Sequence, residues 1–173
     1  MSNVISSEIK EASKLTSEEW KEWTKTVWSI ANISDSIHPA VYPPEIPYRL
    51  IRMFSFVGET VLDPFSGMAT TGRVALQNNR SYIGFETNPV YHSESLRRLS
   101  ESVLPENSYN CHYDVSNSSS CDMSSVKDDS VGIVVTSPPY WNKANYGEYD
   151  GNIGGFEYYD DFLVELQKVF AEC

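Results

Sequence analysis

The sequence predicts an open α/β domain in which a parallel sheet is flanked by helices, and three observations support this fold class. Apolar runs typical of strands alternate with helical patterns along the chain, which favours right-handed crossovers and parallel pairing. A glycine-containing turn, Asp63–Thr71, follows the first of these runs. A proline-locked turn, Ser137–Tyr140, follows the β-branched run Val131–Thr136. Turns at the carboxyl ends of strands are where open α/β sheets bind their ligands.

The N-terminal part is predicted to be helical after a loosely ordered start, residues 1–14. Thr16–Glu19 has the spacing of a capping box and opens a helical stretch over residues 20–28. The tryptophans of this stretch recur with a spacing that indicates one packed face. A second helix is expected over residues 46–54, and Gly58 fits its stop.

Four strands and three further helices are expected beyond that point. The strands are expected at Thr60–Leu62, Ser81–Phe85, Tyr109–Tyr113 and Val131–Thr136. The helices are expected at Thr71–Gln77, at Tyr91–Val103 and, after Gly154 and Gly155, over Phe156–Phe170. The two turns then flank a switch point, which predicts the strand order 3-2-1-4. Because the fourth strand is too apolar for an exposed edge, we expect more polypeptide to lie beside it.

Size and composition restrict the class of protein. The chain has 173 residues and a formal net charge of −11, and it is expected to form one domain in the cytoplasm because it lacks a long apolar run. The cysteines Cys111, Cys121 and Cys173 have no metal-site spacing and are interpreted as ordinary thiols, so no metal is expected. The acidic charge opposes direct binding of duplex DNA, which relies on Lys and Arg.

The first turn and the ends of the second and third strands carry residues suited to a nucleoside-like cofactor. Gly67 lets the backbone pass close to a ligand, and the helix that follows directs free N–H groups at it. Glu86 ends the second strand, about twenty residues on, where an acid accepts hydrogen bonds from ribose hydroxyls. Asp114 is expected to end the third strand, where it would accept from an adenine amino group or merely cap a loop.

Together, Asp63–Thr71 and Ser137–Tyr140 resemble the cofactor loop and the catalytic loop of the S-adenosylmethionine-dependent DNA amino-methyltransferases, whose sheet is Rossmann-like. The resemblance runs from about residue 20 to residue 173 and takes in His38–Pro43 and Arg49–Ile51. It implies S-adenosyl-L-methionine as cofactor and DNA as partner. The cofactor contacts that it implies are His38, Pro39, Ala40, Asp63, Pro64, Phe65, Ser66, Gly67, Thr70, Thr71, Glu86 and Asp114. One departure is Ala69, where the family usually has glycine and a methyl group would press on the cofactor or shift the turn.

The catalytic residues implied by the resemblance are Ser137, Pro138, Pro139 and Tyr140. An exocyclic amine is a poor nucleophile because its lone pair is delocalised into the ring. Acceptors at the Ser137 hydroxyl and the Pro138 carbonyl would hold the two amine hydrogens and direct the lone pair at the sulfonium methyl group. The prolines stiffen the loop, and Tyr140 would stack on a base rotated out of the duplex.

The resemblance implies a single incomplete methyltransferase domain without a target-recognition region. This domain is expected to consist of an N-terminal part (15–58), a cofactor-binding part (59–128) and a part with the catalytic loop and last helix (129–173). Ser137 at the head of the loop favours N4 of cytosine over N6 of adenine as target. A methyltransferase for RNA or protein amino groups, and a non-catalytic subunit or remnant, stay open. A second polypeptide, a continuation of the chain or self-association is expected to complete the sheet.

Overall fold

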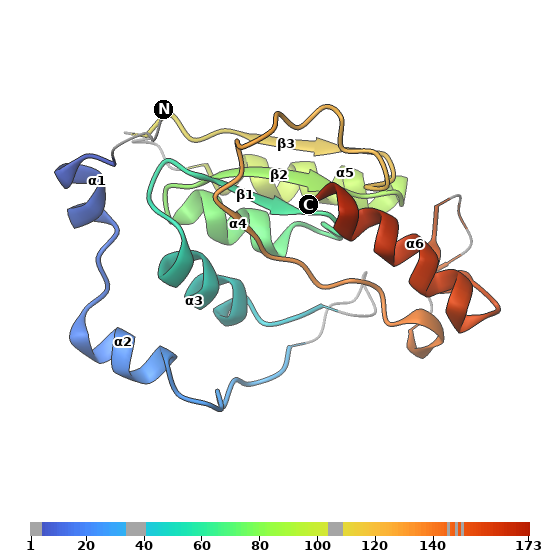
Figure 1. Cartoon of the computed structure of the whole chain (residues 1–173), viewed down its shortest axis with the longest axis horizontal. Helices are drawn as coiled ribbons and strands as arrows, with labels where there is room; N and C mark the ends of the chain where they lie inside the picture. The colour runs from blue at the N-terminus through green and yellow to red at the C-terminus, as the bar shows by residue number, and fades with distance from the viewer. Residues whose placement is uncertain (1–4, 34–40, 104–108, 145, 148, 150) are drawn as a thin grey trace.

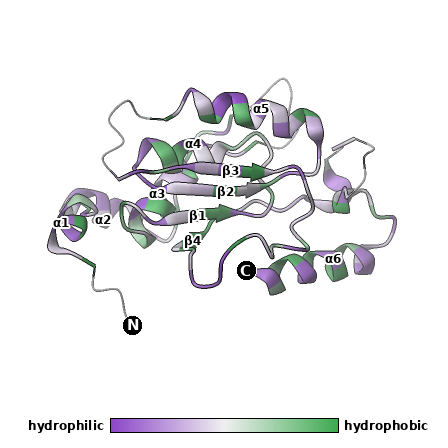
Figure 2. Cartoon of the chain, turned by 90° about the horizontal axis from the view of Figure 1, so that it is seen from above, coloured by the Kyte–Doolittle hydropathy of each residue, from purple (hydrophilic) through white to green (hydrophobic). Residues whose placement is uncertain are grey.

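The computed structural model describes residues 5–33, 41–103, 109–144, 146, 147, 149 and 151–173. Its sheet has four parallel strands in the predicted order β3-β2-β1-β4 (Figure 2), and Figure 1 labels the first three of them. The strands are β1 Thr60–Asp63, β2 Ser81–Phe85, β3 Tyr113–Ser116 and β4 Ile133–Val134. In the register of the central pairs, Leu62 of β1 lies opposite Ile83 of β2 and Val134 of β4. The carboxyl ends of all four strands therefore lie at one edge of the sheet.

Six α-helices are seen in the described part of the chain. They are α1 Ser7–Ala12, α2 Ser17–Trp23, α3 Glu45–Phe54, α4 Thr70–Gln77, α5 Pro89–Ser100 and α6 Tyr159–Glu172, and two short 3-10 turns, η1 Trp141–Lys143 and η2 Ile153–Gly155, precede α6. None of the described helices has the length and apolar character that crossing a membrane requires.

The N-terminal helices confirm one sequence prediction and correct two. The capping box is present, because the Thr16 N–H donates to Glu19 Oε2 at 2.8 Å and the Glu19 N–H donates to Thr16 Oγ1 at 3.1 Å. The loosely ordered start is wrong from Ser6 onward, since Ser6 caps α1. The stretch expected to reach residue 28 ends at Trp23, whose carbonyl accepts from Trp28 Nε1 at 2.9 Å.

The sheet is covered on both faces, as predicted (Figure 2). On one face, a buried cluster joins α3, α4 and α5 to the strands, with Ile51, Val74 and Leu99 packed on Val61 and Tyr82. On the other face, Val169 of α6 and Met123 pack with Leu62 and Phe85. Successive residues of β1 thus point to opposite faces, as a strand buried on both sides requires.

Two glycines make room for the ring of Tyr82, which is fully buried in β2. A Cβ atom at Gly72 of α4 would lie 2.5 Å from Tyr82 Cε1, and one at Gly84 would lie 2.7 Å from the Tyr82 hydroxyl. The hydroxyl donates to Ser66 Oγ at 2.8 Å. Close packing of α4 on β2 therefore places a tyrosine directly beneath the turn that follows β1.

The last two strands differ from their predicted bounds. The third strand was expected at Tyr109–Tyr113, but pairing with β2 begins at Tyr113, opposite Tyr82. Asn110 has a left-handed φ of 51°, which interrupts an extended run. Asp114 consequently lies within β3 and not at its end, so that part of the prediction is wrong. The fourth strand is also shorter than Val131–Thr136, because ladder pairing with β1 covers Ile133 and Val134.

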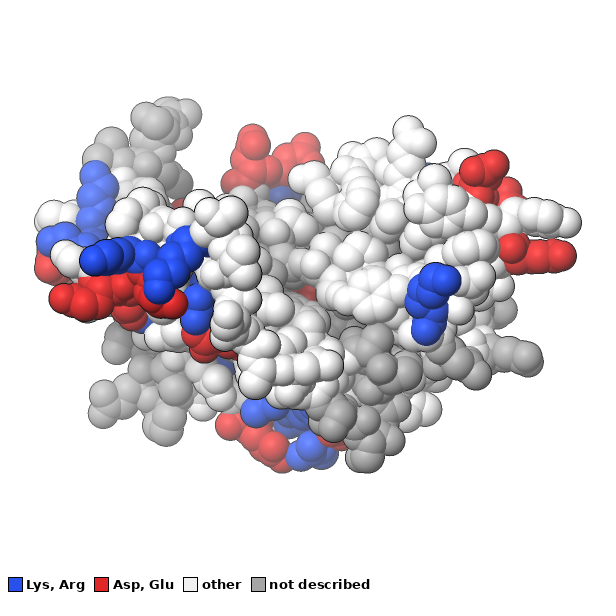
Figure 3. Space-filling model, turned by 90° about the horizontal axis from the view of Figure 1, so that it is seen from below, with Lys and Arg blue, Asp and Glu red and all other residues white. Residues whose placement is uncertain are grey.

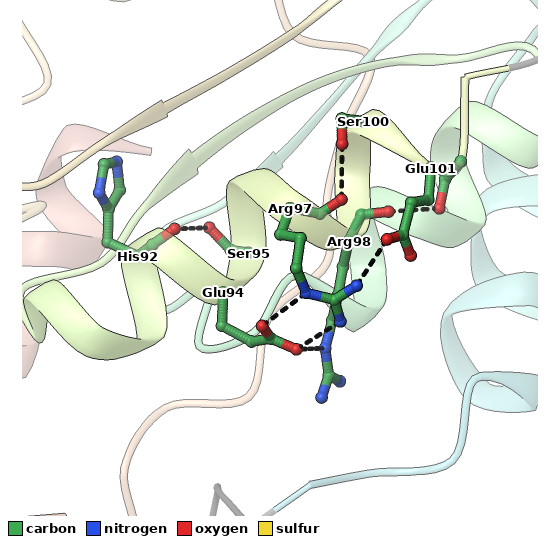
Figure 4. Close-up of polar contacts among 8 residues, drawn as sticks. His92, Glu94, Ser95, Arg97, Arg98, Ser100 and Glu101 are labelled. Carbon is green, nitrogen blue, oxygen red and sulfur yellow. Dashed lines mark hydrogen bonds and ion pairs between the residues drawn. The ribbon is translucent and has the colours of Figure 1, made fainter.

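The outer face of α5 carries a network of ion pairs (Figure 4). Glu94 Oε1 accepts from Arg97 at 2.8 Å and from Arg98 at 2.7 Å, and Arg97 also pairs with Glu101 at 2.6 Å. Hydrogen bonds from Arg97 and Arg98 lower the pKa of Glu94 to about 2. The pair of Arg97 with Glu101 is exposed, and such pairs contribute little to stability.

Candidate functional site

A cleft lies at the carboxyl ends of β1, β2 and β4, with about 850 Å³ of empty space that is partly open to solvent. Residues of both turns singled out in the sequence line it, including Phe65 and Gly67 after β1 and Ser137 and Pro139 after β4. Glu86, at the end of β2, lies between them in the same lining.

The turn after β1 adopts a backbone that favours glycine at two positions. Gly67 has a φ of 52° and Ala69 a φ of 57°, both left-handed. The left-handed conformation costs an alanine about 1 kcal/mol of conformational free energy. The Ala69 methyl group is fully buried in the core cluster of α3, α4 and α5 and is not among the described residues that line the cleft. The departure from glycine therefore strains the turn without taking space from a ligand.

Glu86 is held at the cleft by the backbone of two segments. Its Oε2 accepts from the Gly67 N–H at 2.8 Å, and its Oε1 accepts from the Asn88 N–H at 2.7 Å. Burial raises the pKa of Glu86 to about 7. The two hydrogen bonds lower the pKa, and the nearby Asp63 raises it by a smaller amount. Each carboxylate oxygen has a second lone pair, so Glu86 can still accept from a pair of ligand hydroxyls such as those of a ribose.

Asp63, the last residue of β1, is 1% exposed and lies beneath the cleft. Its Oδ1 accepts from Thr136 Oγ1 at 2.6 Å and from the Phe65 N–H at 3.1 Å. Burial raises the pKa of Asp63 to about 6, against hydrogen bonds from Thr136, Thr71 and Phe65 that lower it. Asp63 thus contacts both turns without lining the space between them.

The turn after β4 presents its polar groups close to solvent. The Ser137 hydroxyl lies 3.1 Å from the Tyr140 hydroxyl, and the Tyr140 N–H donates to the Tyr146 hydroxyl at 3.2 Å. The Tyr140 side chain is 53% exposed. Trp141 has a φ of 48°, a rare conformation for a bulky residue. This arrangement leaves an aromatic ring free to contact a second ligand beside the cleft.

The predicted site residues fall into three groups. Those that line the cleft are Pro64, Phe65, Ser66, Gly67, Thr70, Glu86, Ser137 and Pro139. Asp63, Thr71, Asp114, Pro138 and Tyr140 are not in that lining; Asp114 is exposed on β3, and Asp63 and Thr71 are buried behind the cleft. His38, Pro39 and Ala40 lie outside the described residues.

Other lining residues were not found by sequence reasoning. They include Tyr91 of α5, Ser118–Ser120 after β3, and Tyr146 and Tyr149 after η1. Burial raises the pKa of Tyr149 to about 12, with a further contribution from Glu86. These residues follow no motif; the Ser-rich run is the one signal in the sequence that could have indicated a turn at this edge.

The charges near the site offer little to a polyanion. On the face in Figure 3, most Lys and Arg side chains lie among Asp and Glu side chains, with a broad uncharged area between the clusters. The described residues include no group of three or more His, Cys, Asp or Glu that could hold a metal ion.

Comparison with protein families places residues 2–97 in the N6/N4 DNA methylase model. The matched residues include the turn after β1 and Glu86, and they end before Ser137. Among curated proteins, the type II methyltransferase M.MjaI of Methanocaldococcus jannaschii is 43% identical over 84 residues, 45% of this chain and 27% of that protein. The DNA adenine methyltransferase YhdJ of Escherichia coli K12 is 45% identical over 62 residues, 36% of this chain and 21% of that protein.

Among solved structures, a Thermus thermophilus protein described as a DNA modification methylase matches with a TM-score of 0.51 and 33% identity. The match covers 67% of this chain and 43% of that protein, whose structure was determined in complex with S-adenosyl-L-methionine. In every comparison given above, this chain spans less than half the length of its relative.

Proposed function

The chain belongs to the N6/N4 DNA methylase family, and from this premise we propose that it transfers a methyl group from S-adenosyl-L-methionine to an exocyclic amino group of a DNA base. One observation carries the proposal: the turn after β1 and the turn after β4 line a single cleft, with Glu86 between them. A cofactor loop and a methyl-acceptor loop must meet in this way for direct transfer.

The residues present fit the cofactor. Glu86 has free lone pairs for the ribose hydroxyls and is fixed by the N–H groups of Gly67 and Asn88. The left-handed Gly67 lets the ligand approach the backbone, and the N-terminus of α4 follows at Thr70. When bound, S-adenosyl-L-methionine supplies an electrophilic methyl group on sulfur. The aromatic ring of Phe65 lines the same space.

The chain's own residues prepare the acceptor. The Ser137 hydroxyl, which now contacts the Tyr140 hydroxyl at 3.1 Å, can exchange that bond for one from the amine. The Pro138 carbonyl is the second acceptor in this proposal, and two acceptors orient the lone pair of the nitrogen towards the cleft. The exposed Tyr140 ring offers a stacking surface for a base rotated out of the duplex.

We propose N4 of cytosine as the target atom. The support is Ser137 at the head of the catalytic loop, since the family members with this residue often modify cytosine. YhdJ, which is similar over part of this chain, is a DNA adenine methyltransferase. N6 of adenine is therefore the alternative target, and nucleoside analysis of the product decides between the two.

Further polypeptide is part of this proposal. We propose the division into residues 15–58, 59–128 and 129–173, and we assign target recognition to polypeptide other than these parts. The support is the edge strand β4, where Val134 is 36% exposed, and the exposed apolar side chains Leu163, Val164 and Phe170 of α6. A continuation of the chain, a second polypeptide or a second copy would cover them. The proposed setting is the cytoplasm.

The test is methyl transfer from labelled S-adenosyl-L-methionine to DNA, with and without added neighbouring polypeptide, followed by nucleoside analysis. We expect label in N4-methylcytosine, and expect Ser137→Ala and Glu86→Ala to abolish or strongly reduce it. Cofactor binding without transfer in both arms would favour a non-catalytic subunit or remnant. Label in RNA or protein but not in DNA would contradict the choice of substrate.

A further inference from the structure

The hydrogen bond between Thr136 and Asp63 joins the two turns of the site through the protein interior. Thr136 directly precedes Ser137, and Asp63 directly precedes the turn after β1. The distance between Thr136 Oγ1 and Asp63 Oδ1 is 2.6 Å. The same Oδ1 accepts from the Phe65 N–H at 3.1 Å. A single buried oxygen therefore holds one end of each turn.

Two more segments meet at the same carboxylate. The Thr71 side chain of α4 also bonds to Asp63, and its hydroxyl bonds to the Tyr42 hydroxyl. Asp63 and Thr71 are buried, whereas Tyr42 and Thr136 are partly buried. The network formed by Tyr42, Thr71, Asp63 and Thr136, which we term the carboxylate network, thus links β1, α4, the segment before α3 and the end of β4.

The hydrogen bonds of the turn after β4 itself are local, and Trp141, just beyond it, donates from Nε1 to the Phe156 carbonyl at 2.8 Å and contacts the Tyr159 ring of α6. In the described residues, the hydrogen bonds of Ser137 and Tyr140 connect them to each other, to Lys143 and to Tyr146. Ladder pairing of β4 with β1 covers two residues, and the Val135 N–H donates to Leu62 at 3.0 Å just before the turn. Beyond that point, Thr136 provides the side-chain contact with the core.

We propose that Asp63 and Thr136 are positioning residues for the transfer step, which hold the Ser137–Tyr140 turn at a fixed place relative to the turn that binds the cofactor. This inference rests on the proposed function. Asp63 was expected from the sequence to contact the cofactor, whereas its burial beneath the cleft gives it a role between the two turns. Positioning affects the rate of transfer far more than the affinity for the cofactor, since small displacements of reacting groups slow a reaction strongly.

The test compares Thr136→Val, which keeps the branched shape but removes the hydroxyl, with Thr136→Ser, which restores a hydroxyl. Two properties are measured on the full chain. One is amide hydrogen exchange within residues 137–143, which is reported by Ser137 and residues 140–143 because the two prolines have no amide hydrogen. The other is the dissociation constant for S-adenosyl-L-methionine. With Thr136→Val we expect exchange in residues 137–143 to become about 10-fold faster, with residues 81–85 unchanged and the dissociation constant within about threefold of wild type. Thr136→Ser should restore slow exchange.

Transfer kinetics provide the third measurement. In a preparation that methylates DNA, Thr136→Val should lower kcat by roughly 10- to 100-fold, and Thr136→Ser should recover most of it. Wild-type exchange in residues 137–143 of Thr136→Val, or an unchanged kcat, would overturn the inference. A loss of cofactor affinity as large as the loss of kcat would also overturn it. If the wild-type chain binds the cofactor but transfers no methyl group, the proposed function is wrong. The exchange comparison still decides in that case whether Thr136 holds the turn.

Discussion

The two sides of the site are built very differently. On the cofactor side, β1 is buried on both faces and the turn after it is held by Glu86, Tyr82 and Asp63. On the catalytic side, β4 is an edge strand of two residues, and the turn that follows exposes the Tyr140 ring. One side of the cleft is therefore fixed by the core of the domain, and the other is attached to it through a few contacts.

This difference separates binding from catalysis. The cofactor side has the packing needed to bind a ligand by itself. The catalytic side depends on the bond from Thr136 to Asp63 and, in our proposal, on further polypeptide beside β4. We therefore expect changes on the cofactor side to alter stability and affinity, and changes on the catalytic side to alter mainly the rate of transfer.

The largest effect is expected from Gly72→Ala on the cofactor side. The added Cβ would lie 2.5 Å from Tyr82 Cε1 and 2.9 Å from Leu99 Cδ2, so α4 must move away from β2. We expect the free energy of unfolding to fall by about 3 kcal/mol, as in overpacked cores. Urea denaturation measures it. Gly155→Ala on the catalytic side is the control, because its nearest neighbour would lie at 3.4 Å; an equal loss there would remove the contrast.

The buried carboxyls predict a fall in stability with rising pH. Burial raises the pKa of Asp63 from 3.8 to about 6 and that of Glu86 from 4.5 to about 7. Each contributes stability that is fully present below its unfolded pKa and is lost as the pH rises through its folded pKa. We expect each carboxyl to lower the free energy of unfolding by roughly 2 to 3 kcal/mol between about pH 4 and pH 7.5.

Glu86→Gln isolates the part of the pH dependence due to one carboxyl. The variant has nothing to titrate at position 86, so its free energy of unfolding should fall less steeply than that of wild type over the same pH range. Urea denaturation at intervals of one pH unit provides both curves. Parallel curves would show that Glu86 is ionised throughout, contrary to the effect of its burial.

Glu86→Gln also tests the cofactor side directly. Loss of one charged acceptor should weaken S-adenosyl-L-methionine binding by about 10- to 100-fold, the cost of a poorly paired buried donor. Isothermal calorimetry measures the affinity. Asp114→Asn is the matched control, because Asp114 is exposed within β3 and is not in the cleft lining. Equal affinity of Glu86→Gln and wild type would refute the ribose role.

The smallest effect is expected from Tyr82→Phe. The variant keeps the ring between Gly72 and Gly84 and removes the bond to Ser66 Oγ, which should cost about 1 kcal/mol of stability. Thermal unfolding detects the change. Tyr158→Phe, at an exposed position on the catalytic side, should leave the transition unchanged. If both variants behave alike, Tyr82 does not support the turn through its hydroxyl.

The sheet order was predictable because both ligand turns follow strands. Most helices were predictable from the regular spacing of their apolar residues and from capping residues such as Thr16. It misplaced the third strand because a single left-handed residue, Asn110, shifts where pairing begins, and asparagine tolerates both conformations. The helix at Ser7 was missed because none of its residues is buried, so it leaves no periodic apolar pattern.

The site was predictable where a residue lies at a strand end and contacts the cleft directly, as with Phe65, Gly67 and Glu86. It was not predictable where the role depends on three-dimensional neighbours. Asp63 and Thr136 are 73 positions apart, and neither residue alone indicates their contact. Tyr149 reaches the cleft from a segment without a motif. The expected role of Asp63 in binding the cofactor stays a prediction.

The central claim is that both turns serve one cofactor, and the structure of this chain bound to S-adenosyl-L-methionine tests it most directly. We predict that the ribose hydroxyls contact Glu86 and that the sulfonium methyl group faces the Ser137–Pro138 turn across the cleft. A cofactor bound elsewhere, or one whose methyl group points away from Ser137, would contradict it.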